Sequence, residues 1–170
     1  MMTVNYSDAK HRFIQQWGAL GTVWGISRTM AQIQAVLLLS PEPMTADEIM
    51  EELGISRGNV SMSLKSLIEW GVATKEYKAG ERKEYFRAEK DIYRVATQVA
   101  HERRKRELEP MLHMLESIKD MDDQEVSKSK REEMKKVSSN ILDLGKKCDS
   151  LLKKFISAEK NWFLNKIMKL

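Results

Sequence analysis

The side chains best suited to contact a partner lie between residues 56 and 69, on one face of a predicted helix. In the major groove of DNA an Asn amide can pair with adenine, and Arg or Lys can pair with guanine or with phosphate. The acidic residue of this face, Glu69, lies at its far end. A face of small polar, amide and cationic groups therefore favours contact with DNA. The candidate contact residues are Ser56, Arg57, Gly58, Asn59, Ser61, Met62 and Lys65.

Two predicted helices joined by a tight turn would position these residues. The first begins at Thr45, which forms a capping box with Glu48, and ends at Gly54, where a left-handed residue needs no Cβ. Ser56 is a favourable N-cap for the second helix, which is predicted to extend to about Trp70. The apolar stripe that would bury the second helix consists of Val60, Leu64 and Leu67.

A charged hairpin is predicted after the second helix, with strands at residues 72–77 and 81–87 and with Gly80 in the turn. Helix, turn, helix and hairpin in this order predict a winged helix-turn-helix. In such a domain the second helix enters the major groove, while the wing lies on the backbone or in a minor groove. The wing cations predicted to hold the DNA backbone are Lys78, Arg82 and Lys83.

Five unusual short sequence motifs follow one another between residues 25 and 83. They are GISR at 25–28, LSPEPMT at 39–45, GNVSM at 58–62, EWG at 69–71 and GERK at 80–83. Because of these motifs, a region of roughly residues 17–110 resembles the GbsR-like branch of the MarR-type transcriptional regulators. The resemblance implies a dimeric repressor or regulator whose partner is double-stranded DNA.

Trp17 and Trp24 place much aromatic surface in the N-terminal arm of the chain. Aromatic rings can cage a quaternary ammonium group by cation–π attraction. Because some members of the GbsR-like branch respond to choline, the resemblance implies that these residues could bind a small-molecule effector. The alternative is packing against the body of the protein or a partner chain, which is the more common role of such a surface.

The expected fold class is mainly α, with a winged helix-turn-helix domain that carries a small β-hairpin wing, plus N- and C-terminal dimerisation helices. The predicted domains are an N-terminal helical arm at 1–25, a DNA-binding domain at 26–90 and a helical dimerisation region at 91–170. Helices are expected at 7–20 and 27–39, and glycines should interrupt the chain after the first of them.

The C-terminal region is predicted to be helical from Asp91 onward. Residues 101–107 are polar all round and cannot pack in a core, so they form either a solvated face with i,i+4 ion pairs or a phosphate contact. Pro110 would kink the helix or start a new one, and residues 120–133 indicate a break or an exposed loop. The apolar face of the first part would consist of Ile92, Val95, Ala96 and Val99.

Beyond residue 133, apolar residues recur alternately three and four positions apart over about four heptads. Such a seam needs a partner, which is the helix at 108–119, its own twin in a second chain, or both. On the seam, Cys148 would be a small buried apolar residue. The predicted seam consists of Met134, Val137, Ile141, Leu144, Cys148, Leu151, Phe155, Ala158 and Trp162.

The composition limits the class of protein. The net charge of +4 and the isoelectric point near 9.1 permit a polyanionic partner without requiring one. A lone cysteine cannot form an internal disulfide, which fits a reducing cytoplasm. No apolar stretch approaches about 18 residues and no signal peptide is apparent, so a cytoplasmic protein without a membrane span is expected.

Patterns of catalysis and metal binding are not found in the sequence. There is no Gly-rich phosphate loop, and His11, His101 and His113 are scattered without ligand spacing. Nor does the spacing suggest a Ser–His–Asp or Cys–His group. We therefore expect no enzyme, no metal and no cofactor.

Two classes of function remain open. One is a homodimeric, sequence-specific DNA-binding transcriptional regulator, with or without gating by a small molecule. The other is a winged-helix module that binds protein and lacks specific DNA binding. Acidic residues outnumber basic ones in residues 45–84, so the placement of the cations, and not their number, favours DNA.

Overall fold

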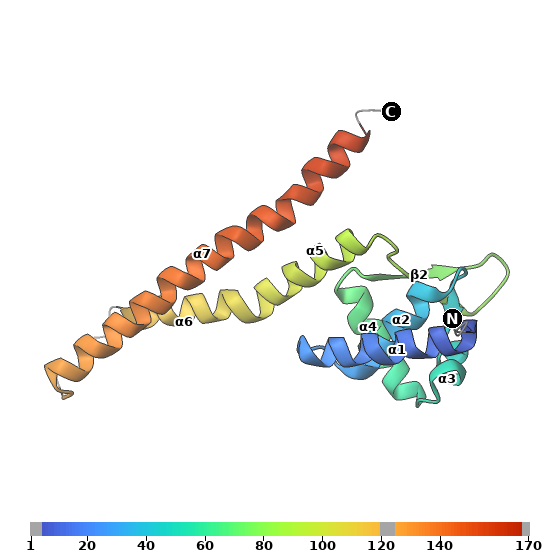
Figure 1. The fold of residues 1–170 in the computed structure, drawn as a ribbon, viewed down its shortest axis with the longest axis horizontal. Helices are drawn as coiled ribbons and strands as arrows, with labels where there is room; N and C mark the ends of the chain where they lie inside the picture. Colours follow the sequence, from blue (N-terminus) through green and yellow to red (C-terminus); the bar gives the residue numbers. More distant parts are fainter. Residues whose placement is uncertain (1–4, 120–124, 168–170) are drawn as a thin grey trace. The chain divides into compact units, whose positions relative to one another are not determined.

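The computed structural model describes the backbone of residues 5–119 and 125–167, and the side chains of residues 5–118 and 125–158 (Figure 1). The chain forms two compact units, Met1–Val95 and Ala96–Leu170. The elements of the first unit are α1 (Tyr6–Val23), α2 (Arg28–Leu39), β1 (Met44–Thr45), α3 (Ala46–Leu53), α4 (Arg57–Glu69), β2 (Ala73–Tyr77) and β3 (Glu84–Ala88).

The first unit is a winged helix, as predicted. Helix α2 packs against α1, α3 and α4, and the predicted apolar stripe of α4 is buried, as are Met30, Ile33, Val36 and Leu37 of α2. Apolar side chains at helical spacing bury one face of each helix because that removes the most apolar surface from water. The fully buried side chains of this core include Ile33, Val36, Leu37, Ile49, Val60 and Leu67.

The sheet has a third strand that the sequence patterns did not predict. Strand β1 pairs antiparallel with β3, with Met44 opposite Phe86 and Thr45 opposite Tyr85, and the strand order is β1-β3-β2. The two prolines of the preceding link favour extended backbone but do not reveal its pairing partner. The second wing strand begins at Glu84 and not at residue 81, because the turn around Gly80 is part of a longer loop.

Helix α1 is longer than the predicted helix at 7–20. It begins after Asn5, whose Oδ1 accepts the Asp8 N–H at 2.8 Å, and it continues through Gly18 and Gly21 to Val23. The glycines do not interrupt it. A Cβ at Gly21 would lie 2.5 Å from Cβ of Ala31, so the missing side chain allows α1 and α2 to pack closely.

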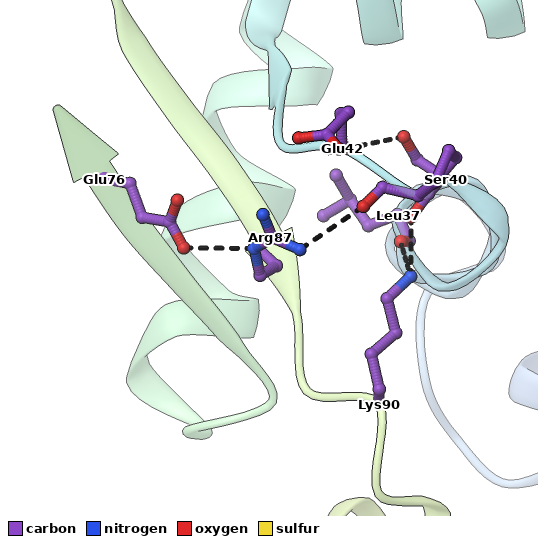
Figure 2. Close-up of polar contacts among 7 residues, drawn as sticks. Leu37, Ser40, Glu42, Glu76, Arg87 and Lys90 are labelled. Carbon is purple, nitrogen blue, oxygen red and sulfur yellow. Dashed lines mark hydrogen bonds and ion pairs between the residues drawn. The ribbon is translucent and has the colours of Figure 1, made fainter. Parts of the chain in front are cut away.

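Lys90 ties the exit from the wing to the end of α2 (Figure 2). Its ammonium donates to the carbonyl oxygens of Leu37, Leu38 and Ser40 at 2.8, 2.6 and 2.7 Å. The last carbonyls of a helix have no intrahelical partner, and a cation there also interacts favourably with the helix dipole. The pKa of Lys90 is lowered mainly by its partial burial and, to a smaller extent, by the positive charge of Arg87. No sequence pattern indicated this contact.

We expect Lys90→Met to lower the free energy of unfolding by about 1–2 kcal/mol, because three carbonyls lose a charged donor while the apolar stem is kept. Urea unfolding followed by tryptophan fluorescence measures the loss. Lys83→Met is the matched control, since that lysine is exposed at the wing tip. Equal midpoints for Lys90→Met and the wild type would contradict the role of this contact.

The second unit contains the rest of the helical chain. Its elements are the greater part of α5 (Ile92–Arg103), a π-helical turn (Arg104–Leu108), α6 (Glu109–Lys119) and α7 (Lys128–Ile167). The predicted helix start at Asp91 is confirmed to within one residue, since Asp91 caps α5 and its Oδ1 accepts the N–H groups of the second and third helical residues. The predicted break at 120–133 is too long, because α7 begins at Lys128; residues 120–124 lie outside the described residues.

Two further predictions for this region are corrected. In α5, Ile92 and Ala96 are exposed and Thr97 is buried in their place. The polar run 101–107 forms the predicted i,i+4 ion pairs, but Arg104 is largely covered, with a side chain only 15% exposed. Its Nε lies 2.6 Å from Oδ1 of Asp149 on α7, so an ion pair lets this charge pack inside the helical unit.

Helix α7 packs on α6 through a face that is offset by one residue from the predicted seam. Its buried residues are Ser138, Leu142, Gly145 and Asp149, and Leu142 packs against Leu112 and Leu115. A Cβ at Gly145 would lie 2.7 Å from Cδ2 of Leu112. The predicted seam is instead exposed, Cys148 included, and the side chain of Trp162 lies outside the described residues. Its exposed large members are Met134, Val137, Ile141, Leu144, Leu151 and Phe155.

Candidate nucleic-acid interface

Helix α4 presents its polar face to solvent because its apolar stripe is fixed in the core. Val60, Leu64 and Leu67 are at most 3% exposed, and α2 packs against this side of α4. The predicted contact residues all lie on the solvent side. The exposed residues of this predicted set are Ser56, Arg57, Gly58, Asn59, Ser61, Met62 and Lys65.

The turn before α4 is fixed by local hydrogen bonds. Gly54 ends α3 with φ at 62°, and the Ser56 hydroxyl accepts the Asn59 N–H at 3.4 Å. At the start of α3, Oε2 of Glu48 accepts the Thr45 N–H at 2.6 Å, and this backbone hydrogen bond lowers the pKa of Glu48. The two predicted caps therefore set the direction in which both helices leave the turn.

Arg57 is engaged by a residue that the sequence did not single out. Its guanidinium forms an ion pair with the carboxylate of Asp47 at the start of α3, and both side chains are about two-thirds exposed. The residues are ten positions apart on different helices, so no helical spacing rule relates them. An exposed pair of this kind contributes at most about 1 kcal/mol and can exchange partners easily.

The strands of the wing hold their charges in cross-strand pairs. Nζ of Lys75 lies 2.9 Å from Glu84, and Nε of Arg87 lies 3.2 Å from Glu76. The hydrogen bond from Lys75 lowers the pKa of Glu84, so this carboxylate stays charged and paired. These residues neutralise one another along the strands.

The tip of the wing carries the cations predicted to touch DNA. Lys78, Arg82 and Lys83 are exposed in the loop between β2 and β3. Nζ of Lys78 lies 4.1 Å above the centroid of the Tyr85 ring, and the Tyr85 hydroxyl donates to Glu81. The tip is therefore a positive, exposed surface of the winged unit that also carries the polar face of α4.

The two tryptophans proposed for effector binding have different surroundings. Trp17 is partly buried, stacks on Phe13 with centroids 5.4 Å apart, and donates from Nε1 to Oε1 of Gln34 at 3.2 Å. Trp24 ends α1 and is 54% exposed. They are two helical turns apart, about 10 Å along the axis. Packing accounts for Trp17, while an effector role for either ring stays a prediction.

Metal sites and membrane-spanning helices are both absent from the described residues. Among them, no three His, Cys, Asp or Glu side chains are grouped so that they could hold a metal ion. No helix in the described part of the chain has the length and apolar character needed to cross a membrane.

Comparison with known proteins relates part of the winged unit to transcriptional regulators. The family described as "Bacterial regulatory protein, arsR family" matches residues 30–75, from α2 into β2. The HTH-type transcriptional repressor GbsR of Bacillus subtilis (strain 168) is 35% identical over 75 residues, 44% of this chain and 41% of the relative. The repressor OpcR of the same organism is 27% identical over 70 residues, 41% of this chain and 38% of the relative.

A third relative, the putative HTH-type transcriptional regulator YvaV of Bacillus subtilis (strain 168), is 24% identical over 86 residues, 51% of this chain and 49% of the relative. The chain thus spans about half the length, or less, of the curated relatives it matches. A crystal structure of a transcriptional regulator superimposes with a TM-score of 0.57 at 19% identity, covering 86% of this chain and 97% of that one. The predicted winged-helix fold and the resemblance to GbsR-like proteins are confirmed.

Proposed function

We propose that this relative of the GbsR and OpcR repressors is a homodimeric, sequence-specific DNA-binding transcriptional regulator that acts as a repressor. The observation that carries the proposal is the exposed polar face of α4, which lies within the segment that matches regulators, and the basic wing tip of the same unit supports it. In this proposal residues 26–90 form the DNA-binding domain and residues 91–170 the dimerisation region.

Helix α4 enters the major groove in this proposal. Asn59 pairs with adenine, and Ser56, Arg57, Ser61 and Lys65 meet base edges or nearby phosphates. The wing cations Lys78, Arg82 and Lys83 hold the flanking backbone. Base contacts supply the preference for one sequence, whereas phosphate contacts supply affinity that falls as salt rises.

The homodimer is supported by apolar side chains that one chain leaves in solvent. The outer stripe of α7 is defined by the six exposed seam residues from Met134 to Phe155, and it is separate from the face around Leu142 that packs on α6. Burying such a stripe against a second copy removes it from water. The two α4 helices of a dimer would then read successive major grooves of a pseudo-palindromic site.

A small-molecule effector is a further part of the proposal. Trp17 lies on α1 and Trp24 directly follows it, while α1 packs on α2 and α2 packs on α4. A ligand held by either ring would therefore act on a helix that supports the DNA-reading helix. The choice of effector is left to screening.

Fluorescence anisotropy across a salt series tests the proposed function. The purified chain is titrated with its own upstream DNA and with a scrambled duplex. Salt-sensitive binding that prefers the upstream DNA supports the proposal. Equal binding to both duplexes contradicts a regulator that acts at its own promoter. Binding that does not change with salt favours the protein-interaction module, for which the acidic surface of α3 is the supporting observation.

We expect Asp47→Asn to strengthen binding to both duplexes about threefold to tenfold, because Arg57 then contacts DNA without first giving up its ion pair with Asp47. The control is Glu51→Gln, which removes the same charge from an exposed position of α3. An equal gain in both variants would show that the general charge of α3, and not the release of Arg57, is responsible.

A further inference from the structure

Gly58 is a glycine that the fold does not require. All eight glycines lie in the described residues, and four of them, Gly25, Gly54, Gly71 and Gly80, have positive φ. A Cβ at Gly18, Gly21 or Gly145 would come within 2.7 Å of a neighbouring side chain. Gly58 has neither property: its φ is ordinary, and a Cβ there would meet nothing within 4 Å.

Glycine at this position has a cost for folding. In a helix, glycine is less favourable than alanine because its backbone loses more conformational freedom. Since neither backbone geometry nor packing inside the chain explains Gly58, its missing side chain points to another surface that comes close. Glycine is the residue that permits such an approach of backbone to a ligand.

The position of Gly58 on α4 identifies the surface concerned. Gly58, Met62 and Lys65 follow one another at spacings of four and three, so they lie along one line of the helix. This line is opposite the buried stripe of Val60 and Leu64. Gly58 and Met62 therefore form the outermost part of α4 near its N-terminus, and Met62 is 67% exposed.

The line of Gly58, Met62 and Lys65 is called here the outer ridge of α4. Its chemistry favours an A·T pair over a G·C pair. A Met side chain offers only apolar contact, and in the major groove the apolar group on a base is the 5-methyl of thymine. Asn59, the neighbouring amide, suits adenine. The cations of the wing tip, in the same unit, supply the charge complementarity to the DNA backbone.

We infer that Gly58 lets α4 approach the floor of the major groove closely, and that Met62 packs there against a thymine methyl group, so that each half-site contains an A·T pair at this point. The inference rests on the proposed DNA-binding function. It names the base pair that the outer ridge of α4 reads.

The first test separates stability from binding. Gly58→Ala should raise the melting temperature by about 2 °C, because a helical glycine is removed from an open position. The same variant should bind its DNA about tenfold more weakly, because the added methyl group holds α4 away from the bases. Gly21→Ala is the matched control for stability. It should lower the melting temperature, since its Cβ would lie 2.5 Å from that of Ala31.

The second test addresses the thymine methyl directly. Duplexes enriched by the wild-type chain from a randomised library are remade with deoxyuridine in place of each thymidine in turn, which removes only the methyl group. Each half-site should contain one thymidine whose replacement weakens wild-type binding about fourfold. This is the effect expected from losing one buried methyl group. Met62→Ala should bind the thymidine and deoxyuridine duplexes equally well.

The outcomes distinguish this inference from the proposed function. A wild-type chain that enriches no sequence overturns both. A wild-type chain that enriches a sequence, but tolerates every deoxyuridine and is unaffected by Gly58→Ala, overturns the inference and leaves the DNA-binding function standing. Loss of affinity at one thymine in the wild type, absent in Met62→Ala, supports the inference.

Discussion

Replacing Leu144 and Leu151 by glutamate is expected to turn the proposed dimer into a monomer and to weaken binding to the enriched duplex by about 100-fold or more. The two leucines are 64% and 66% exposed on the outer stripe of α7, so two charges there should not disturb the fold of one chain. In a dimer they would be buried without partners. A monomer binds one half-site and loses the effective concentration that a linked second half-site provides.

Sedimentation equilibrium measures the association, and anisotropy on the enriched duplex measures the affinity. The matched control is the double variant Ser139→Glu and Ser157→Glu, which adds the same two charges at exposed positions of α7 outside the stripe. The control should stay dimeric. If the leucine variant remained a dimer with unchanged affinity, the outer stripe would not be the subunit interface.

The helix-turn-helix could be predicted from the sequence because its signals are local. Thr45 and Glu48 cap α3 within one turn, Gly54 supplies the left-handed residue that ends it, and Ser56 caps α4. Each signal involves residues at most three positions apart, so no knowledge of the tertiary fold is needed. The solvent face of α4, and with it the candidate contacts, follows from the position of the buried stripe.

The packing of α7 could not be predicted in the same way. Its most apolar seam faces solvent, whereas its buried face includes Ser138, Gly145 and Asp149. The small residues allow α6 to come close, and the carboxylate is covered because Arg104 reaches it from the π-helical turn. Lys153 and Arg104 also lower the pKa of Asp149. A count of apolar residues selects the wrong face when small residues and an ion pair make the contact.

Contacts between residues distant in sequence were missed for a related reason. The amine of Lys90 reaches carbonyls 50 to 53 residues earlier in the chain, and β1 pairs with a strand about 40 residues later. Neither contact has a periodic pattern or a local cap that sequence inspection can detect. Both fix the wing against α2, so part of what positions the candidate site is visible only in the fold.

Replacing Lys78, Arg82 and Lys83 by alanine is expected to weaken binding to the upstream and scrambled duplexes alike, on the order of 100-fold near 0.1 M salt. Each cation that neutralises a phosphate contributes about 0.9 to the slope of log affinity against log salt. If all six wing-tip cations of a dimer touch phosphate, the slope should become shallower by about 5. The preference between the two duplexes should change little, because phosphate contacts carry no direct sequence information.

The matched control separates a local contact from a change in net charge. Lys130→Ala, Lys136→Ala and Lys147→Ala together remove the same charge from exposed positions of α7. If net charge alone governed the affinity, the two triple variants would weaken binding equally and by less than the wing prediction, since exposed charges beyond about 10 Å are screened at 0.1 M salt. A larger loss for the wing variant, with a shallower salt slope, would place phosphate at the wing tip. Equal slopes for the wing variant and the wild type would instead remove the wing from the interface and leave α4 to bind DNA alone.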